Sequence, residues 1–107
     1  MTPDEIFRQL PSHLDETAAK GLNATIQFNL TGEDGGHWYV TVKDGQATAH
    51  SGTASAPNMT MSMTAQDYVD LSLGKLNRQM AFMSGRLKIS GDVSLAMKTQ
   101  TLFRPLR

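Results

Sequence analysis

The stretch GKLNRQMAFMSGRLKISGDVSLAMK, residues 74–98, predicts a helix, a strand and a second helix, separated by polar residues and glycines. Asn77 begins the first helix, because an asparagine side chain can accept a hydrogen bond from a free backbone N–H of the first turn. We expect this helix over residues 78–84. Gly85 then ends it, since glycine readily adopts the left-handed conformation in which many helices terminate. The remaining helices and strands are predicted outward from this stretch.

A strand and a last helix follow within the same stretch. The alternation over residues 86–90 predicts a strand with Leu87 and Ile89 turned inward. Asp92 caps the helix after it, and Pro105 is expected to stop that helix near the end of the chain. The residues that we expect on its apolar face are Val93, Leu95, Ala96, Met97, Thr99, Leu102 and Phe103.

Upstream, the apolar pattern predicts an N-terminal helix and four more strands. Thr2, Pro3 and Glu5 form a helix start, in which the threonine caps the first turn and the carboxylate completes a capping box. Asp44-Gly45 predicts a tight hairpin turn, because both positions of such a turn need positive φ. Alternating apolar residues predict strands over residues 24–30, 38–43, 46–51 and 59–64. The third of these is weakly apolar and is expected at an edge of the sheet.

A further helix is expected before residue 74, capped by Thr64 and ended by Gly74, with Tyr68, Leu71 and Ser72 on one face. Five one-faced strands with helices before and after them predict an α+β fold. In this fold the helices pack on one face of a five-stranded sheet, and the other face meets solvent. The inward residues of the strands then form a single apolar floor.

The composition is that of one globular domain over residues 1–107, with 39% hydrophobic and 19% charged residues. The sequence contains no apolar run that could span a bilayer and no secretory signal at its start, so we expect a cytoplasmic protein. It has no cysteine, which excludes disulfides and thiolate chemistry. The formal net charge is zero, but residues 1–54 carry three Lys/Arg against seven Asp/Glu, and residues 55–107 carry seven against three. A basic half of this kind can contact anionic head groups or phosphates.

No catalytic group or cofactor site is evident in the sequence. His13, His37 and His50 lie in unrelated segments without the spacing of metal ligands. Ser84 does not stand in a G-x-S-x-G motif, and Lys75 lacks the glycines of a phosphate-binding loop. Aromatic residues are not interleaved with basic ones, so nucleic-acid binding is not expected either. We therefore predict a protein that is not an enzyme and that holds no metal or cofactor.

Six methionines between Met59 and Met97 are the most unusual feature of the composition. Methionine is flexible and polarizable, so it can line a cavity that accepts ligands of different shapes. It also fills irregular gaps in ordinary cores. The pattern alone leaves both interpretations open.

The stretch at residues 74–98 also resembles the signature of the sterol carrier protein 2 domain family, in a small stand-alone and bacterial form. The matching positions are Gly74, Lys75, Asn77, Gln79, Ala81, Phe82, Gly85, Leu87, Lys88, Ile89, Gly91, Asp92, Ala96 and Lys98. The resemblance extends over about residues 21–103. Arg78 departs from the pattern, which has proline after the asparagine. The resemblance implies two layers, a five-stranded sheet and helices on one face, that enclose an apolar cavity or tunnel.

The resemblance implies a cavity for fatty acids, fatty acyl-CoA, phospholipids or sterols. By position, the residues expected to bind lipid are Trp38, Val40, Met61, Tyr68, Leu71, Gln79, Met80, Met83, Ile89, Leu95, Met97, Leu102 and Phe103. Gln79 is the polar contact expected at the cavity mouth. The residues expected to contact a head group or a membrane surface are Lys75, Arg78, Arg86, Lys88, Lys98 and Arg104.

The leading hypothesis is a monomeric, non-catalytic carrier that binds an apolar lipid in a tunnel and contacts membranes transiently. One alternative is an accessory or scaffold protein that holds a prenylated quinone precursor for partner enzymes. Another is a domain with a filled core and only an interaction role.

Overall fold

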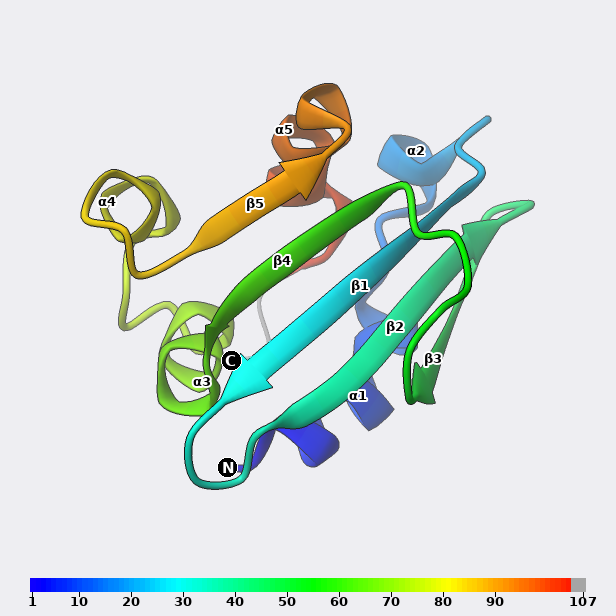
Figure 1. The fold of residues 1–107 in the computed structure, drawn as a ribbon. Helices are drawn as coiled ribbons and strands as arrows, with labels where there is room; N and C mark the ends of the chain where they lie inside the picture. The colour runs from blue at the N-terminus through cyan, green and yellow to red at the C-terminus, as the bar shows by residue number, and fades with distance from the viewer. Residues whose placement is uncertain (105–107) are drawn as a thin grey trace.

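Five strands lie side by side in one mixed sheet in the computed structural model, which describes residues 1–104 (Figure 1). The strands are β1 (Ala24–Thr31), β2 (Gly36–Lys43), β3 (Gln46–Ser51), β4 (Met59–Thr64) and β5 (Lys88–Gly91). Their order across the sheet is β3-β2-β1-β4-β5. The central strands β1 and β4 are parallel, and every other neighbouring pair is antiparallel. The weakly apolar β3 lies at an edge, as its sequence predicts.

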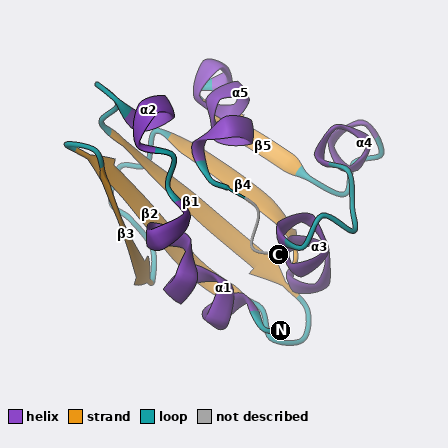
Figure 2. Ribbon diagram, turned by 180° about the vertical axis from the view of Figure 1, so that it is seen from behind, coloured by secondary structure: helices purple, strands orange, loops and turns teal. Residues whose placement is uncertain are grey.

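The helices gather on one face of this sheet, which confirms the predicted α+β fold. They are α1 (Pro3–Gln9), the 3₁₀ helix η1 (Leu10–His13), α2 (Glu16–Ala19), α3 (Ala65–Ser72), α4 (Arg78–Met83) and α5 (Val93–Leu102). Seen from behind the sheet, α1, α2, α3 and α5 lie in front of the strands, and α4 stands beyond the end of β5 (Figure 2). The helix side of the sheet therefore holds the core.

The predicted caps and turns form as expected from short-range chemistry. The Thr2 hydroxyl accepts from the Glu5 N–H, and the Glu5 carboxylate accepts from the Thr2 N–H, which completes the capping box. The Asn77 side chain accepts from the Met80 N–H at 3.1 Å at the start of α4. Asp44 has a φ of 54° and Gly45 a φ of 76°, the positive values that the hairpin turn requires. These local signals set the ends of the elements.

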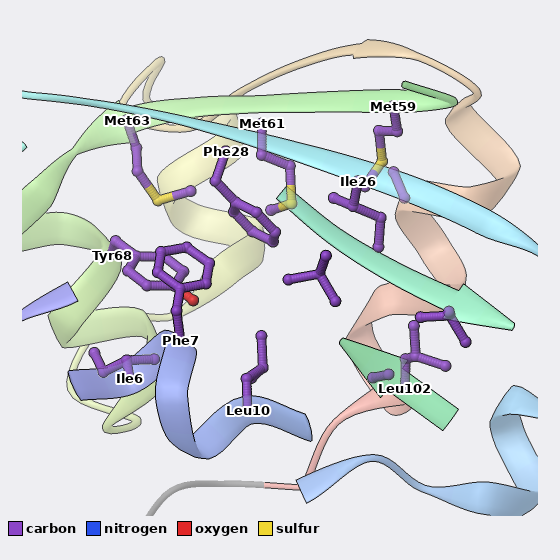
Figure 3. Close-up of a cluster of buried hydrophobic side chains, with 14 of the residues drawn as sticks. Ile6, Phe7, Leu10, Ile26, Phe28, Met59, Met61, Met63, Tyr68 and Leu102 are labelled. Carbon is purple, nitrogen blue, oxygen red and sulfur yellow. The ribbon is translucent and has the colours of Figure 1, made fainter. Parts of the chain in front are cut away.

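The core is packed between the inward residues of the strands and the N-terminal helices. The Phe7 ring stacks on Tyr68 at 4.8 Å and on Trp38 at 5.0 Å, and its edge meets Phe28 at 5.1 Å between ring centroids. Figure 3 shows the methionines of β4 and the apolar residues of β1 pointing toward α1, α3 and α5. Of the methionines, Met59, Met61 and Met63 are at most 5% exposed. One face of β4 is therefore built from sulfur-containing side chains.

Most of the opposite face of the sheet meets solvent, as predicted, but the loop from β3 to β4 covers part of it. Gln27 points to that face and is only 2% exposed. Its Nε2 donates to the Gly52 carbonyl at 3.2 Å, and its Oε1 accepts from the Ala54 N–H at 2.8 Å. The loop from β3 to β4 thus runs across this face, as Figure 1 shows. It brings β4 alongside β1 in parallel.

The C-terminal elements differ in detail from their predicted bounds. The strand β5 begins at Lys88 rather than at residue 86. The helix α5 ends at Leu102, and Phe103 is extended and pairs with Leu14 in an isolated bridge, so Phe103 does not continue the helix. Val93 is 70% exposed, so its predicted place on the buried face is wrong. Pro105, the predicted helix stop, lies outside the described residues.

Candidate ligand-binding site

A cavity of about 390 Å³ lies between the sheet and the helices. Its floor comes from the inward positions of β1 and β4, and its walls come from η1, α3, the start of α4 with the segment before it, and the C-terminal half of α5 with the residues after it. The residues that line it are Leu10, Ile26, Phe28, Met61, Tyr68, Leu71, Ser72, Gly74, Asn77, Arg78, Gln79, Thr99, Phe103 and Arg104. This volume falls in the range of about 300–1,000 Å³ typical of small-molecule sites.

A second, smaller cavity of about 150 Å³ lies over β5, between α4 and α5. Its residues are Met61, Arg78, Gln79, Phe82, Leu87, Ile89, Val93, Ala96, Met97 and Thr99. The two cavities share Met61, Arg78, Gln79 and Thr99. They therefore meet at the start of α4, with Arg78 between them.

Tyr68 lines the larger cavity and carries a buried hydroxyl. Its side chain is packed against Phe7, and its Oη has no hydrogen-bond partner among the described residues. The nearby Ser72 hydroxyl donates at 2.8 Å to the backbone carbonyl of Tyr68 and leaves the phenol unpaired. Burial raises the pKa of Tyr68 well above its ordinary value, so the phenol keeps its proton. It is a donor without an acceptor.

Arg78 brings a cation to the junction of the two cavities. Its Nη1 donates to the Thr99 hydroxyl at 3.3 Å, and that hydroxyl donates in turn to the Ala96 carbonyl at 2.7 Å. The guanidinium forms no ion pair within residues 1–104. Its partial burial lowers the pKa of Arg78, since a charge away from water is less stable. The residue that departs from the family signature is therefore a cation inside the site.

The other predicted head-group cations lie outside the cavity or at its edge. Arg86 is paired with Asp67, whose two carboxylate oxygens accept from its Nε and Nη2. That bond raises the pKa of Arg86. Lys75, Lys88 and Lys98 have exposed side chains. Arg104 lines the larger cavity, is exposed, and donates to the Ser12 carbonyl at 3.1 Å.

The structure brings seven of the predicted lipid-binding residues to the cavities. Five line the larger cavity, namely Met61, Tyr68, Leu71, Gln79 and Phe103. Ile89 and Met97 line the smaller one, although Met97 is 69% exposed and so lies at its rim rather than on a buried helix face.

Six predicted lining residues are not brought to either cavity. Four of them pack in the core instead, namely Trp38, Val40, Leu95 and Leu102. Met80 and Met83 point to solvent, because α4 buries only Ala81 against the rest of the molecule. Their predicted place in the cavity wall is corrected accordingly.

Several lining residues were not predicted. Leu10, Ile26 and Phe28 belong to apolar faces that the sequence pattern identifies, so extending the lining to every inward position of β1 and η1 would have found them. Thr99 was placed on the apolar face of α5 without a role. Its importance comes from its partner Arg78, which lies in another helix and leaves no signal in the pattern.

Exposed apolar side chains cluster on the two C-terminal helices. They are Met80, Phe82, Met83, Val93 and Met97, each more than half exposed. Three of these, Phe82, Val93 and Met97, also border the smaller cavity. Apolar surface of this kind often marks an interaction face.

Residues 1–104 contain no group of three His, Asp or Glu side chains that could hold a metal ion. None of the helices described is long and apolar enough to cross a bilayer.

Fold and cavity together define a small α+β domain with a cavity, lined by both apolar and polar side chains, between a sheet and its helices. The chain belongs to the SCP-2 sterol transfer family, whose domains bind and transfer lipids, and residues 4–104 match it. It is 39% identical over 100 residues to "Hydroxysteroid dehydrogenase-like protein 2" of Rattus norvegicus, a match that covers 92% of this chain and 19% of that protein. The chain thus spans about a fifth of that relative.

Solved structures show the same fold. The sterol carrier protein domain 2 of Helicoverpa armigera superposes with a TM-score of 0.75 at 28% identity, over 91% of this chain and 81% of that one. A domain of the sec-alkylsulfatase Pisa1 from Pseudomonas sp. superposes with a TM-score of 0.80 at 25% identity, over 97% of this chain and 17% of that chain. The same fold therefore makes up most of one solved chain and a small part of a larger enzyme.

Proposed function

We propose that this chain binds the apolar part of a single lipid molecule in the cavity between the sheet and the helices, and carries it to a membrane or an enzyme. The observation that carries the proposal is the larger cavity, with Ile26, Phe28 and Met61 on its floor and Leu10 and Leu71 on its walls. A concave site in which apolar side chains are combined with polar groups that can orient a ligand is typical of small-molecule binding. Membership of the family supports the same conclusion.

Apolar burial supplies enough free energy for this role. Each buried methylene contributes about 0.8 kcal/mol, so a chain of about sixteen carbons offers on the order of 12 kcal/mol before the cost of immobilisation. No single side chain has to dominate. Met61 adds flexibility to the floor, because a thioether can repack around chains of different shape.

The test is to fill the cavity with a side chain of this protein. Leu71→Trp places an indole on the wall, and we expect it to abolish binding of a fluorescent fatty acid to the cavity. Tyr39→Trp is the matched control, since Tyr39 is on the opposite face of the sheet, where it stacks on His50. If Leu71→Trp remained folded and bound the probe as well as wild type, the proposed site would be wrong.

A second proposal concerns delivery, and it rests on the exposed apolar side chains of α4 and α5. We propose that Met80, Met83 and Met97 contact a membrane surface while the lipid enters or leaves, with exposed lysines such as Lys98 near anionic head groups. Replacing the three methionines with serine should weaken binding to anionic vesicles without loss of fold. Binding that is unchanged by the substitutions and by added salt would contradict this proposal.

A partner-dependent scaffold for a prenylated quinone precursor would use the same cavity. It differs from a free carrier in requiring a stable enzyme complex. Affinity purification from the native cell separates the two, since a free carrier brings down lipid but no enzyme. The cavity volume favours either of these roles over a filled-core interaction domain.

A further inference from the structure

A hydrogen bond between two helices stands where the two cavities meet. Arg78 at the start of α4 donates from Nη1 to the Thr99 hydroxyl of α5 at 3.3 Å, and both residues line both cavities. Arg78 is half-buried and Thr99 is buried. The Thr99 hydroxyl is itself fixed, since it donates to the Ala96 carbonyl at 2.7 Å. The side chain of Arg78 is therefore held in the passage from one cavity to the other.

The junction is polar, whereas the smaller cavity beyond it is apolar. Arg78, Gln79 and Thr99 are the polar residues that line the smaller cavity within residues 1–104, and all three also line the larger one. Met61 of β4 belongs to the floor of both cavities, so the apolar floor continues beneath the junction. The other residues of the smaller cavity are Phe82, Leu87, Ile89, Val93, Ala96 and Met97.

We propose that the bond between Arg78 and Thr99 is a barrier that limits the length of the bound apolar chain, because it closes the larger cavity toward the smaller one. This inference rests on the proposed lipid binding and assigns to Arg78 a role in determining specificity. An alkyl chain that crossed the junction would separate the guanidinium from its acceptor and surround it with apolar groups, which is unfavourable for a charge. A chain that stays in the larger cavity leaves the bond intact.

The barrier is expected in this chain rather than throughout the family. Arg78 stands where the family signature has proline, which has no side-chain donor to offer Thr99. The space that the barrier withholds is about 150 Å³, next to a cavity of about 390 Å³. Each methylene that entered it would raise the affinity about fourfold. Removal of the barrier should therefore have a measurable effect on long ligands.

The first experiment asks which cavity a bound chain occupies. Leu71 lines only the larger cavity and Ile89 only the smaller one, whereas Ile6 lies in the core and lines neither. Leucine and isoleucine methyl signals are followed by NMR on addition of decanol or octadecanol, neutral probes that differ only in chain length. In wild type we expect both alcohols to shift the Leu71 signals and to leave those of Ile89 and Ile6 unchanged.

The second experiment measures affinity against chain length, by displacement of a fluorescent fatty acid with straight-chain alcohols from decanol to octadecanol. In wild type the affinity should rise about fourfold per methylene and then level off once the larger cavity is full. Arg78→Ala removes the side chain and its bond. In this variant the affinity should level off at a chain several methylenes longer, and octadecanol should now shift the Ile89 methyl signal.

Two further variants separate the barrier from a general loosening of the fold. The double variant Arg78→Ala/Ile89→Trp fills the smaller cavity with an indole, and it should return the limit to the wild-type chain length. Lys98→Ala is the matched control, since Lys98 is an exposed cation on α5 that lines neither cavity, and it should leave the limit unchanged. Thermal denaturation of the ligand-free variants checks that they are folded.

The outcomes distinguish this inference from the proposed function. If octadecanol shifts the Ile89 signal of wild type as much as the Leu71 signals, the chain crosses the junction and the barrier is overturned, a result that requires no variant. The same limiting length in wild type and in a folded Arg78→Ala variant also overturns it. Both results leave lipid binding intact. If no alcohol of any length binds wild type, the proposed function itself fails.

Discussion

The Arg78 guanidinium donates from Nη1 to the Thr99 hydroxyl at 3.3 Å, which links the start of α4 to the middle of α5. Both residues line both cavities, so this bond stands where the two cavities meet. It lies across twenty-one positions of sequence. The contact turns a residue that departs from the family signature into a fixed part of the site.

Thr99→Val should destabilise the protein, because it removes the acceptor of Arg78 with almost no change in shape. Thr99 is 6% exposed, and loss of a partner that leaves a buried charged donor unpaired costs about 1–3 kcal/mol. Urea denaturation measures the effect. Thr101→Val is the matched control, since Thr101 is exposed on the same helix, donates to the Lys98 carbonyl, and should change stability by less than about 0.5 kcal/mol. Equal effects of the two substitutions would rule out the role of Thr99.

Tyr68→Phe should stabilise the ligand-free protein. The substitution removes a buried hydroxyl that has no partner, and leaving such a group unsatisfied costs about 1–3 kcal/mol. The ring contacts with Phe7 and Phe28 remain. We expect a gain in the free energy of unfolding of about 1 kcal/mol in urea denaturation. A clear loss of stability would mean that the phenol makes a bond in solution. The control is Tyr39→Phe, on the opposite face.

Asp67→Ala should lower the free energy of unfolding more than the same substitution at Asp4, which forms an ion pair on the surface. The Asp67 side chain is 11% exposed and accepts two bonds from Arg86, which is itself half exposed. Because water screens the Arg86 side of the pair, we expect a loss of about 1–2 kcal/mol in the free energy of unfolding. The comparison is Asp4→Ala, which breaks an i,i+4 pair with Arg8 between side chains that are 52% and 78% exposed. That substitution should cost about 0.5 kcal/mol or less.

Gly91→Ala should be far more damaging than Gly85→Ala. Both glycines have positive φ, 96° and 81°, so both substitutions strain the backbone by about 1–2 kcal/mol. A Cβ at position 91 would also lie 2.6 Å from the Asn58 carbonyl oxygen, whereas a Cβ at position 85 meets nothing within 4 Å. The first substitution must therefore separate β5 from β4. If the unfolding midpoints fell equally for both variants, the close approach of the Asn58 backbone would not be what requires glycine at position 91.

Asp92 should make stability depend on pH in acid. Bonds from the Ser94 hydroxyl and the Leu95 N–H lower the pKa of Asp92 from its ordinary value of 3.8. A carboxylate with a lowered folded-state pKa stabilises the protein above the unfolded-state pKa, and this stabilisation is lost as the pH falls through the folded-state pKa. Asp92→Asn keeps a capping oxygen but does not titrate. The difference in urea midpoint between wild type and variant should therefore shrink below the ordinary pKa. A constant difference would contradict this account.

The elements and their ends were predictable because they depend on residues close together in the chain. Thr2, Asn77 and Asp92 cap helices through atoms two or three residues away. The alternation of β1 and β4 showed which side chains face the helices. The open face was harder to predict, since Gln27 is buried by a loop twenty-five and more residues away.

The site was only partly predictable, and the methionines show why. Met61 and Met83 are the same residue type and were both predicted to line the cavity, yet one is buried in the cavity floor and the other is 76% exposed. A periodic pattern tells which way a side chain points from its own helix or strand. It does not tell how far the next element lies. The helix α4 buries only Ala81. The pattern predicted that Met80 and Met83 of this helix point inward, but both meet solvent.

The sequence by itself determined the five strands, the helix caps, the hairpin turn and the family, because each rests on contacts within a few residues or on a motif that is read directly. Only the tertiary structure decided that a cavity of about 390 Å³ remains beneath the helices, that the buried Tyr68 hydroxyl has no partner among the described residues, and that Arg78 is held by Thr99 of another helix. These properties depend on the distances between elements remote in sequence. Those distances are set by packing, such as Phe7 between Tyr68 and Trp38.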